Sequence, residues 1–200
     1  MLVKICGITR LEDAVVAVEC GAQALGFVFW PGSPRAIDPS RARAIVRTLP
    51  PFVTAVGVFV NQAVEYVNQV AALVGLGVVQ LHGDESVVYA SGISQPVLKA
   101  LTVDAARGPA CEQWPATTMI LLDAHDPVRR GGTGQTIDWT EAASVASRRR
   151  IILAGGLTPD NVACAIASVR PFGIDVSSGL EQAPGIKDRG RIRSLFEAIS

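Results

Sequence analysis

Residues 2–10 read LVKICGITR and open the chain with a short apolar segment that ends at Cys6. A brief apolar run followed by glycine is typical of a buried strand. Enzymes built on parallel sheets carry their reactive side chains where the strands end. The stretch therefore predicts a strand over 2–6 and makes Cys6 the first candidate for a functional residue.

Seven further segments of this kind follow along the chain. They are short, apolar and rich in β-branched residues, and they lie at 24–29, 54–60, 77–83, 96–101, 118–123, 150–156 and 173–178. Helical patterns separate most of them, which predicts parallel strands joined by right-handed crossovers. Eight such units can close into an α/β fold, the (β/α)8 TIM barrel, for which 200 residues is about the lower size limit. An open, doubly wound sheet is the alternative.

The helices between the strands begin at recognisable capping residues. Aspartate accepts hydrogen bonds from the free N–H groups of a first helical turn, which makes it a favoured N-cap. The clearest such position is Asp38. Asp138 and Asp188 are predicted to begin helices over 139–147 and 189–199, and Asn61, Asp84 and Asp160 to begin helices over 63–73, 85–90 and 160–168. The weakest unit is 102–116, where Gly108 and Pro109 interrupt any helix.

The composition favours a small-molecule ligand. Apolar residues make up 49% of the chain and charged residues 18%, against an average of about 25%, so much of the chain is expected to be buried. Eighteen basic residues balance eighteen acidic ones, and no basic stripe indicates nucleic-acid binding. No apolar run approaches the length of a membrane span.

The cysteines predict a reduced, cytoplasmic protein. Four are present, Cys6, Cys20, Cys111 and Cys164, and none belongs to a C-x-x-C pair. Their spacing supports no zinc site. Lys4 interrupts the first apolar run, so the N-terminus does not resemble a signal peptide. The chain has no linker or shift in composition, which predicts one domain over residues 1–200.

Unusual polar residues gather where the predicted strands end. Side chains alternate along a strand, so Lys4 shares a face with Cys6, and Asp175 shares one with Ser177. Polar side chains inside a barrel are costly unless they are paired. Because the first and last strands of a closed barrel are neighbours, we expect Lys4 and Asp175 to pair inside it.

Two glycine-rich segments predict a phosphate site. Gly155 and Gly156 follow the seventh strand, and Ser177, Ser178 and Gly179 follow the eighth. Glycine allows a backbone to approach a ligand closely, and exposed N–H groups there can surround a phosphate. The loops after strands seven and eight are the recurrent phosphate site of TIM barrels. Ordinary tight turns are the alternative, but two such loops on adjacent strands favour phosphate.

Asp123 ends the sixth strand and is the candidate general acid. Its commonest other role is to cap a helix. A long loop follows it over 124–137, and its glycines at 131, 132 and 134 suggest a mobile cover over the site. A carboxyl partly shielded by such a loop could act as a general acid.

Two other side chains allow more than one interpretation. Most free cysteines are simply small buried residues, but the strand-end position of Cys6 and the nearby Lys4, which would favour a thiolate, argue for reactivity. His82 follows Gln80 on the same face of the fourth strand, and is equally compatible with a ligand contact and with a satisfied core residue.

The segment FWPGSPRAI (29–37) supplies a cation to the same end of the predicted barrel. Its prolines stiffen the loop, so that Arg35 could form a fork to a carboxylate and Trp30 could stack on a ring. A surface loop with a solvated arginine is the alternative. A thiol, a carboxyl, an arginine and a phosphate site together suit proton transfer on a phosphorylated, anionic, sugar-like substrate. The sequence contains no cofactor fingerprint and no set of metal ligands.

Taken in order, these motifs resemble the phosphoribosylanthranilate isomerase family of tryptophan biosynthesis. The matching stretches span nearly the whole chain: KICGIT (4–9), GFVFWPGSPR (26–35), VGVFVN (56–61), VQLHGDE (79–85), LLDA (121–124), GGTGQTIDW (131–139), LAGGLTPDNV (153–162) and DVSSGLEQAPGIKD (175–188). Residues 124–130 and 102–116 match no motif of the family, which bears on loop closure and substrate affinity but not on the reaction.

The resemblance implies an Amadori rearrangement of N-(5′-phosphoribosyl)anthranilate without metal or cofactor, by a monomer or a homodimer. It implies that Asp123 is the general acid that opens the ribose ring and that Cys6 is the general base at C2 of the sugar. Arg35 would hold the anthranilate carboxylate. The backbone of Gly155, Gly156, Ser177, Ser178 and Gly179 would bind the phosphate. His82 lies in a family motif as part of the substrate site, but receives no catalytic role.

Two alternatives to this interpretation differ in their chemistry. A related phosphosugar enzyme on a TIM barrel, such as another isomerase, an epimerase or an indole-forming synthase, would share the phosphate loops but use other acids and bases. A non-catalytic phosphate-binding barrel would need neither Cys6 nor Asp123.

Overall fold

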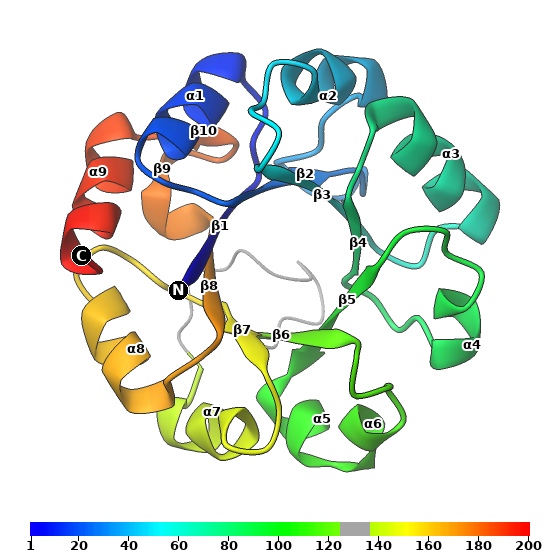
Figure 1. Ribbon diagram of the computed structural model, residues 1–200, viewed down its shortest axis with the longest axis vertical. Helices are drawn as coiled ribbons and strands as arrows, with labels where there is room; N and C mark the ends of the chain where they lie inside the picture. Colours follow the sequence, from blue (N-terminus) through cyan, green and yellow to red (C-terminus); the bar gives the residue numbers. More distant parts are fainter. Residues whose placement is uncertain (125–136) are drawn as a thin grey trace.

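The computed structural model describes residues 1–124 and 137–200, and within them eight parallel strands form a closed barrel with helices around it (Figure 1). The strands are β1 (Leu2–Cys6), β2 (Ala24–Val28), β3 (Thr54–Phe59), β4 (Val78–Leu81), β5 (Val97–Thr102), β6 (Met119–Asp123), β7 (Ile151–Leu153) and β8 (Gly173–Val176). β1 pairs with β2 on one side and with β8 on the other, which confirms the TIM barrel and excludes an open sheet. The cover predicted over 124–137 lies almost wholly outside the described residues.

The helices form the outer layer of the barrel. They are α1 (Leu11–Glu19), α2 (Pro39–Val46), α3 (Val64–Val74), α4 (Val87–Ala90), α5 (Val103–Arg107), α6 (Pro109–Glu112), α7 (Trp139–Ala146), α8 (Val162–Val169) and α9 (Arg189–Ala198). As predicted, Asp38, Asp138 and Asp188 accept N-cap hydrogen bonds, and the weak unit is divided into α5 and α6 at Gly108.

Three of the six cap predictions, those at Asn61, Asp84 and Asp160, were wrong. Asn61 adopts a left-handed conformation with φ 54° and uses its carboxamide to hold Asp84, accepting from the backbone nitrogen at 2.7 Å. The helices predicted after these two residues begin later, at Val64 and Val87, and α4 is capped by Ser86. α8 likewise begins at Val162 without a side-chain cap. In each case the polar residue belongs to the loop at the C-terminal end of a strand.

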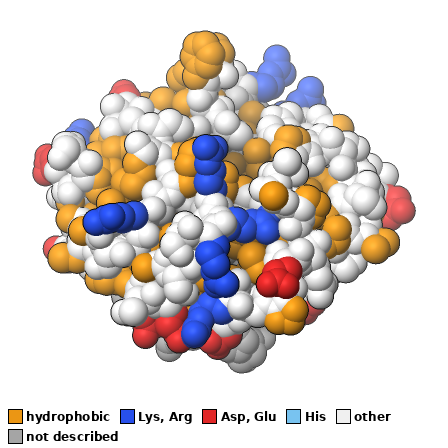
Figure 2. All heavy atoms as spheres, turned by 60° about the horizontal axis from the view of Figure 1, so that its bottom comes forward, with side chains coloured by type: hydrophobic (Ala, Val, Ile, Leu, Met, Phe, Trp, Pro, Cys, Tyr) orange, Lys and Arg blue, Asp and Glu red, His pale blue; other side chains and the backbone are white. Residues whose placement is uncertain are grey.

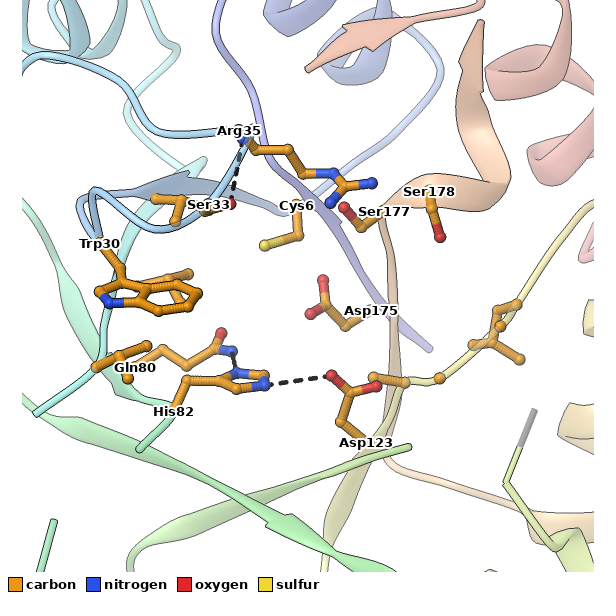
Figure 3. A pocket seen from close by; sticks show the side chains of 17 residues that line it. Cys6, Trp30, Ser33, Arg35, Gln80, His82, Asp123, Asp175, Ser177 and Ser178 are labelled. Atoms are coloured by element: carbon orange, nitrogen blue, oxygen red, sulfur yellow. Dashed lines mark hydrogen bonds and ion pairs between the residues drawn. The ribbon is translucent and has the colours of Figure 1, made fainter. Parts of the chain in front are cut away.

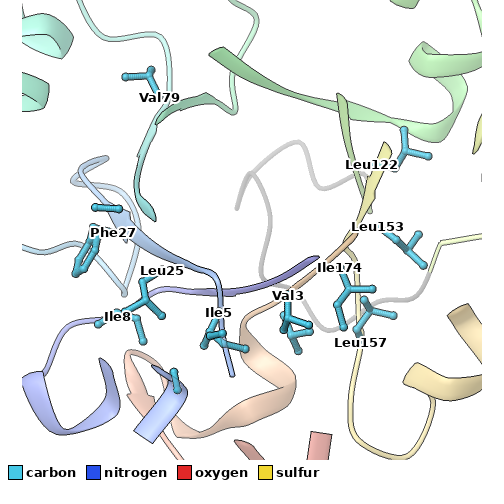
Figure 4. Close-up of a cluster of buried hydrophobic side chains, with 14 of the residues drawn as sticks. Val3, Ile5, Ile8, Leu25, Phe27, Val79, Leu122, Leu153, Leu157 and Ile174 are labelled. Atoms are coloured by element: carbon cyan, nitrogen blue, oxygen red, sulfur yellow. The ribbon is translucent and has the colours of Figure 1, made fainter. Parts of the chain in front are cut away.

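The main hydrophobic core lies between the strands and the helices. Its side chains from β1 are Val3 and Ile5, which point outward to the helices, as Figure 4 shows. Lys4 and Cys6 alternate with them and face the barrel interior. Burying each large apolar side chain contributes roughly 1.5–3 kcal/mol to stability. Because side chains alternate along a strand, packing Val3 and Ile5 in this core directs Lys4 and Cys6 to the barrel interior.

Lys4 and Asp175 form the predicted ion pair inside the barrel. The distance from Lys4 Nζ to Asp175 Oδ2 is 2.8 Å, and both side chains are buried. The two residues are also register partners in the pairing of β1 with β8. The prediction from strand alternation and barrel closure is therefore confirmed.

A short hairpin follows β8 and lies over the outside of β1. After the single turn Ser178–Leu180, the chain forms β9 (Glu181–Ala183) and β10 (Ile186–Lys187), which lie beside α1 and α9 in Figure 1. Thr9 donates its hydroxyl to the carbonyl of Gly185, and Lys187 donates its backbone N–H to Asp13 Oδ2 at 3.1 Å. These contacts attach the hairpin to the first strand–helix unit.

The surface carries both signs of charge. On the face shown in Figure 2, basic and acidic side chains are interspersed with apolar and uncharged ones. None of the helices in the part of the chain that the structure describes is long and apolar enough to cross a membrane.

Candidate active site

A cavity opens at the C-terminal ends of the strands, and nearly all of the predicted site residues line it. They are Cys6, Arg35, His82, Asp123, Gly155, Gly156, Ser177 and Ser178 (Figure 3). The chain brings them there from β1, β6 and the segments after β2, β4, β7 and β8. Trp30, the predicted stacking residue, lines the same cavity.

Gly179 is the predicted site residue that does not line the cavity. A Cβ atom at this position would lie 2.0 Å from the carbonyl oxygen of Leu157. Gly179 therefore allows the segment after β8 to pass close to the segment after β7. Its contribution is to bring the two predicted phosphate loops together.

The loop after β7 is held in shape by its own side chains. Gly155 and Gly156 both adopt left-handed conformations, with φ of 81° and 62°, which non-glycine residues rarely adopt. Asn161 donates to the carbonyl of Gly156 at 2.9 Å and accepts from the backbone nitrogen of Thr158 at 2.8 Å. No role for Asn161 was predicted from the sequence, and its contacts are those of a loop brace.

Cys6 is buried at the end of β1, and burial raises the pKa of its thiol. The positive charge of Lys4 opposes that shift but does not outweigh it. Lys4 therefore favours a thiolate, as expected, but burial outweighs its effect, and the nearby Asp175 adds to the rise in the pKa. In the free protein Cys6 is held mainly as a thiol at neutral pH.

Asp123 is contacted by the imidazole of His82 and by the backbone nitrogen of Ala124. The distance from His82 Nε2 to Asp123 Oδ2 is 3.2 Å, and the backbone nitrogen of Ala124 donates to Oδ1 at 2.8 Å. Gln80 Nε2 lies 2.8 Å from His82 Nδ1, so in this amide orientation Nδ1 accepts and Nε2 carries the proton. His82 thus both lines the cavity and has partners on both ring nitrogens, and its contact with Asp123 was not predicted.

Arg35 forms the predicted fork, but its partner is a carboxylate of the protein. Its Nε lies 2.9 Å from Glu181 Oε1, and its Nη2 lies 2.8 Å from Glu181 Oε2. Glu181 opens the β9–β10 hairpin and is a site residue that sequence reasoning missed. No pattern in the sequence links it to Arg35, since the two are 146 positions apart.

The arrangement separates a carboxyl from a thiol across one cavity. In Figure 3 Asp123 and Cys6 lie on opposite sides of it, with Arg35 and the Ser177–Ser178 segment along one edge. Such a site can donate a proton at one side of a bound molecule and remove one at the other. Within residues 1–124 and 137–200, no three histidine, cysteine, aspartate or glutamate side chains are grouped as metal ligands would be.

Comparison with known proteins gives one consistent family. Residues 3–198 match the family model described as N-(5'phosphoribosyl)anthranilate (PRA) isomerase. A curated relative with the corresponding name, from Pelobacter propionicus, is 50% identical over 196 residues, which cover 97% of this chain and 93% of the relative.

Solved structures with the same name are similar over the whole barrel. The crystal structure of phosphoribosyl anthranilate isomerase from Thermus thermophilus superimposes with a TM-score of 0.91 at 43% identity, covering 100% of this chain and 98% of that chain. A second structure is a complex with reduced 1-(o-carboxyphenylamino)-1-deoxyribulose 5-phosphate, and has a TM-score of 0.86 at 43% identity, covering 99% of this chain and 97% of that chain.

Proposed function

The chain belongs to the N-(5′-phosphoribosyl)anthranilate isomerase family, and we propose that Asp123 and Cys6 perform its reaction as general acid and general base. The protein acts in tryptophan biosynthesis, where it converts N-(5′-phosphoribosyl)anthranilate to 1-(2-carboxyphenylamino)-1-deoxyribulose 5-phosphate by an Amadori rearrangement. The observation that carries the two assignments is that a carboxyl and a thiol lie on opposite sides of one cavity.

Asp123 opens the sugar ring. It gives its proton to the ring oxygen while the bond between that oxygen and C1 breaks, and the lone pair of the anilinic nitrogen forms a C1–nitrogen double bond. The product of this step is an open-chain Schiff base. The hydrogen bond from Ala124 and the contact with His82 support this role, because they fix the direction of the carboxyl and stabilise the carboxylate that remains.

Cys6 acts on the Schiff base from the other side of the cavity. The thiolate form of Cys6, which is the minor form in the free protein, removes the proton from C2. The bonding electrons shift to form a C1–C2 double bond while the nitrogen becomes neutral. The resulting enolamine tautomerises to the ketone. The strand-end position of Cys6 supports this assignment, because β1 holds the sulfur atom in a fixed place.

The two anionic ends of the substrate are bound by different parts of the cavity. Arg35 takes the anthranilate carboxylate, with Trp30 against the aromatic ring. The backbone around Gly155, Gly156 and Ser178 takes the phosphate. The complex of a relative with a reduced product analogue supports a ligand of this kind. The match to the isomerase family argues against the other phosphosugar enzymes and the non-catalytic barrel.

The direct test is the loss of phosphoribosylanthranilate fluorescence on addition of purified protein. We expect rapid first-order decay that depends on enzyme concentration and yields the ketose product. A fluorescence decay equal to the spontaneous rate would contradict the proposed function.

Arg35→Ala is expected to raise KM by about 30-fold with a much smaller change in kcat, because it removes a charge-assisted fork to the substrate carboxylate. Steady-state kinetics from the fluorescence assay measure both parameters. The matched control is Arg43→Ala, which removes an exposed arginine from α2. An unchanged KM in Arg35→Ala would show that the carboxylate is bound elsewhere.

Gly26→Ala is expected to lower kcat about 10²-fold, because a small displacement of a catalytic group is costly. A Cβ at this position on β2 would lie 2.6 Å from Cys6 Sγ and 3.1 Å from Cys6 Cα, so the thiol must move. Gly108→Ala is the control, since its Cβ would meet nothing closer than 3.5 Å. Thermal denaturation checks that both variants fold; wild-type turnover by folded Gly26→Ala would argue against Cys6 as the base.

A further inference from the structure

Glu181 holds Arg35 and Lys187 at the same time. Arg35 donates to both oxygens of the Glu181 carboxylate, and Lys187 Nζ donates to Glu181 Oε1 at 2.8 Å. Glu181 is 7% exposed and Lys187 is 2% exposed. The three side chains therefore form a buried cation–anion–cation cluster, which we call the Glu181 cluster.

The charges of the Glu181 cluster leave Arg35 able to bind an anion. Burial works against the charged form of Glu181, but its hydrogen bond from Arg35 and the charge of Lys187 outweigh that effect and lower its pKa. Burial also lowers the pKa of Lys187, although Glu181 opposes that shift. With Lys187 protonated, one positive charge remains uncompensated within the cluster. Without Lys187, the charge of Glu181 would neutralise that of the Arg35 guanidinium, which faces the cavity.

The same cluster reaches the predicted phosphate loop. Lys187 Nζ donates to the carbonyl oxygen of Ser177 at 3.1 Å. Gly7 fits between the two anion sites: a Cβ there would lie 2.7 Å from Arg35 Cδ and 3.3 Å from Ser177 Oγ. Figure 3 shows the guanidinium of Arg35 beside Ser177 at one edge of the cavity. A continuous chain of contacts thus runs from Arg35 through Glu181 and Lys187 to Ser177.

We propose that Glu181 and Lys187 are positioning residues that tie the carboxylate-binding arginine to the phosphate loop and so fix the spacing between the two anion sites. This inference rests on the proposed function, because it takes Arg35 and the Ser177 loop as the sites for the two ends of the substrate. Neither Glu181 nor Lys187 lines the cavity, so each acts through a neighbour. The rigid link lowers the conformational entropy that the two anion sites of the protein lose when the substrate binds.

The test is binding of each half of the substrate to Glu181→Gln, which keeps the size of the side chain and removes its charge. Anthranilate probes the arginine site by proton NMR titration, and inorganic phosphate probes the loop by ³¹P NMR. Glu181→Gln adds a positive charge to the cluster, but it also releases Arg35 and Lys187 from their shared partner, and we expect this loss of positioning to raise both dissociation constants about tenfold. Arg35→Ala should weaken the binding of anthranilate alone. In the double variant, the dissociation constant for anthranilate should exceed that of Arg35→Ala by less than about twofold, because Glu181 acts on anthranilate through Arg35.

The matched control is Gln182→Ala, an exposed neighbour on β9, and it should leave both constants unchanged. A general weakening of the fold would instead lower the melting temperature and leave the two mutations additive. Unchanged phosphate affinity in Glu181→Gln, or additive effects with Arg35→Ala, would overturn the proposal. Should Glu181→Gln not fold, Glu181→Asp gives the same test with a shortened side chain. These measurements need no turnover, so their failure is distinct from failure of the isomerase assay.

Discussion

Cys6→Ala is expected to lower kcat about 10³-fold while KM stays close to the wild-type value, because the side chain acts in proton transfer rather than in binding. A loss of that size equals about 4 kcal/mol of transition-state stabilisation. Cys6 is buried, and alanine differs from it only by the absence of the sulfur atom. The substitution therefore leaves the position of the sulfur empty without disturbing β1. Steady-state kinetics in the fluorescence assay measure the two parameters.

The control is Cys164→Ala, which removes an exposed thiol from α8 and should keep full activity. The protonation state of the Cys6 thiol is tested separately, by the pH dependence of enzyme inactivation with iodoacetamide. Only the thiolate reacts, and the pKa of Cys6 is raised by burial, so inactivation should be slow at neutral pH and accelerate as the pH rises beyond the usual thiol range. Near-normal turnover in Cys6→Ala would eliminate the thiol as the base.

The barrel could be predicted because its pattern is local and repeated. Each strand is a short apolar segment, and each strand is joined to the next by the same right-handed crossover. Few topologies are compatible with eight such strand–helix units. The pairing of Lys4 with Asp175 followed from two regular features, the alternation of side chains and the adjacency of first and last strands. It required no knowledge of distances, and the 2.8 Å contact confirms it.

The helix starts at Asn61 and Asp84 could not be predicted from capping preferences. Both residues can cap a helix, but here they hold one another, and Glu85 accepts from the backbone nitrogen of Asn61 at 2.7 Å. Lys99 on β5 in turn holds Glu85 at 2.8 Å. A local preference of about 1 kcal/mol is thus overridden by a network that joins the loops after β3 and β4 to the buried Lys99 of β5.

The finer geometry of the site depends on contacts between distant segments. His82 directly follows β4 and Asp123 ends β6, and these strands are not neighbours in the barrel, so strand alternation does not predict that their side chains come into contact. Glu181 reaches Arg35 only because the hairpin folds over β1. The protonation of Cys6 depends on the balance between burial and the charge of Lys4, and the sequence indicates the charge but not the burial.

Asp123→Asn is expected to lower kcat about 10³-fold as well, since an amide keeps the shape of the carboxyl but cannot deliver the proton that opens the ring. Binding should survive, so the dissociation constant of reduced 1-(o-carboxyphenylamino)-1-deoxyribulose 5-phosphate, measured by calorimetry, should stay close to that of the wild type. The introduced amide cannot accept from both of the donors that hold Asp123, because only one of its two terminal atoms is an oxygen.

His82→Gln separates the loss of the acid from the disturbance of its surroundings. Glutamine offers an N–H donor but no titratable group, and it leaves the carboxyl of Asp123 in place. If His82 only orients Asp123, His82→Gln should retain most of the activity that Asp123→Asn loses. Two outcomes would remove Asp123 as the acid: turnover of Asp123→Asn within about tenfold of the wild type, or an equal loss in His82→Gln. The second would assign the proton donor to the histidine that now contacts Asp123 at 3.2 Å.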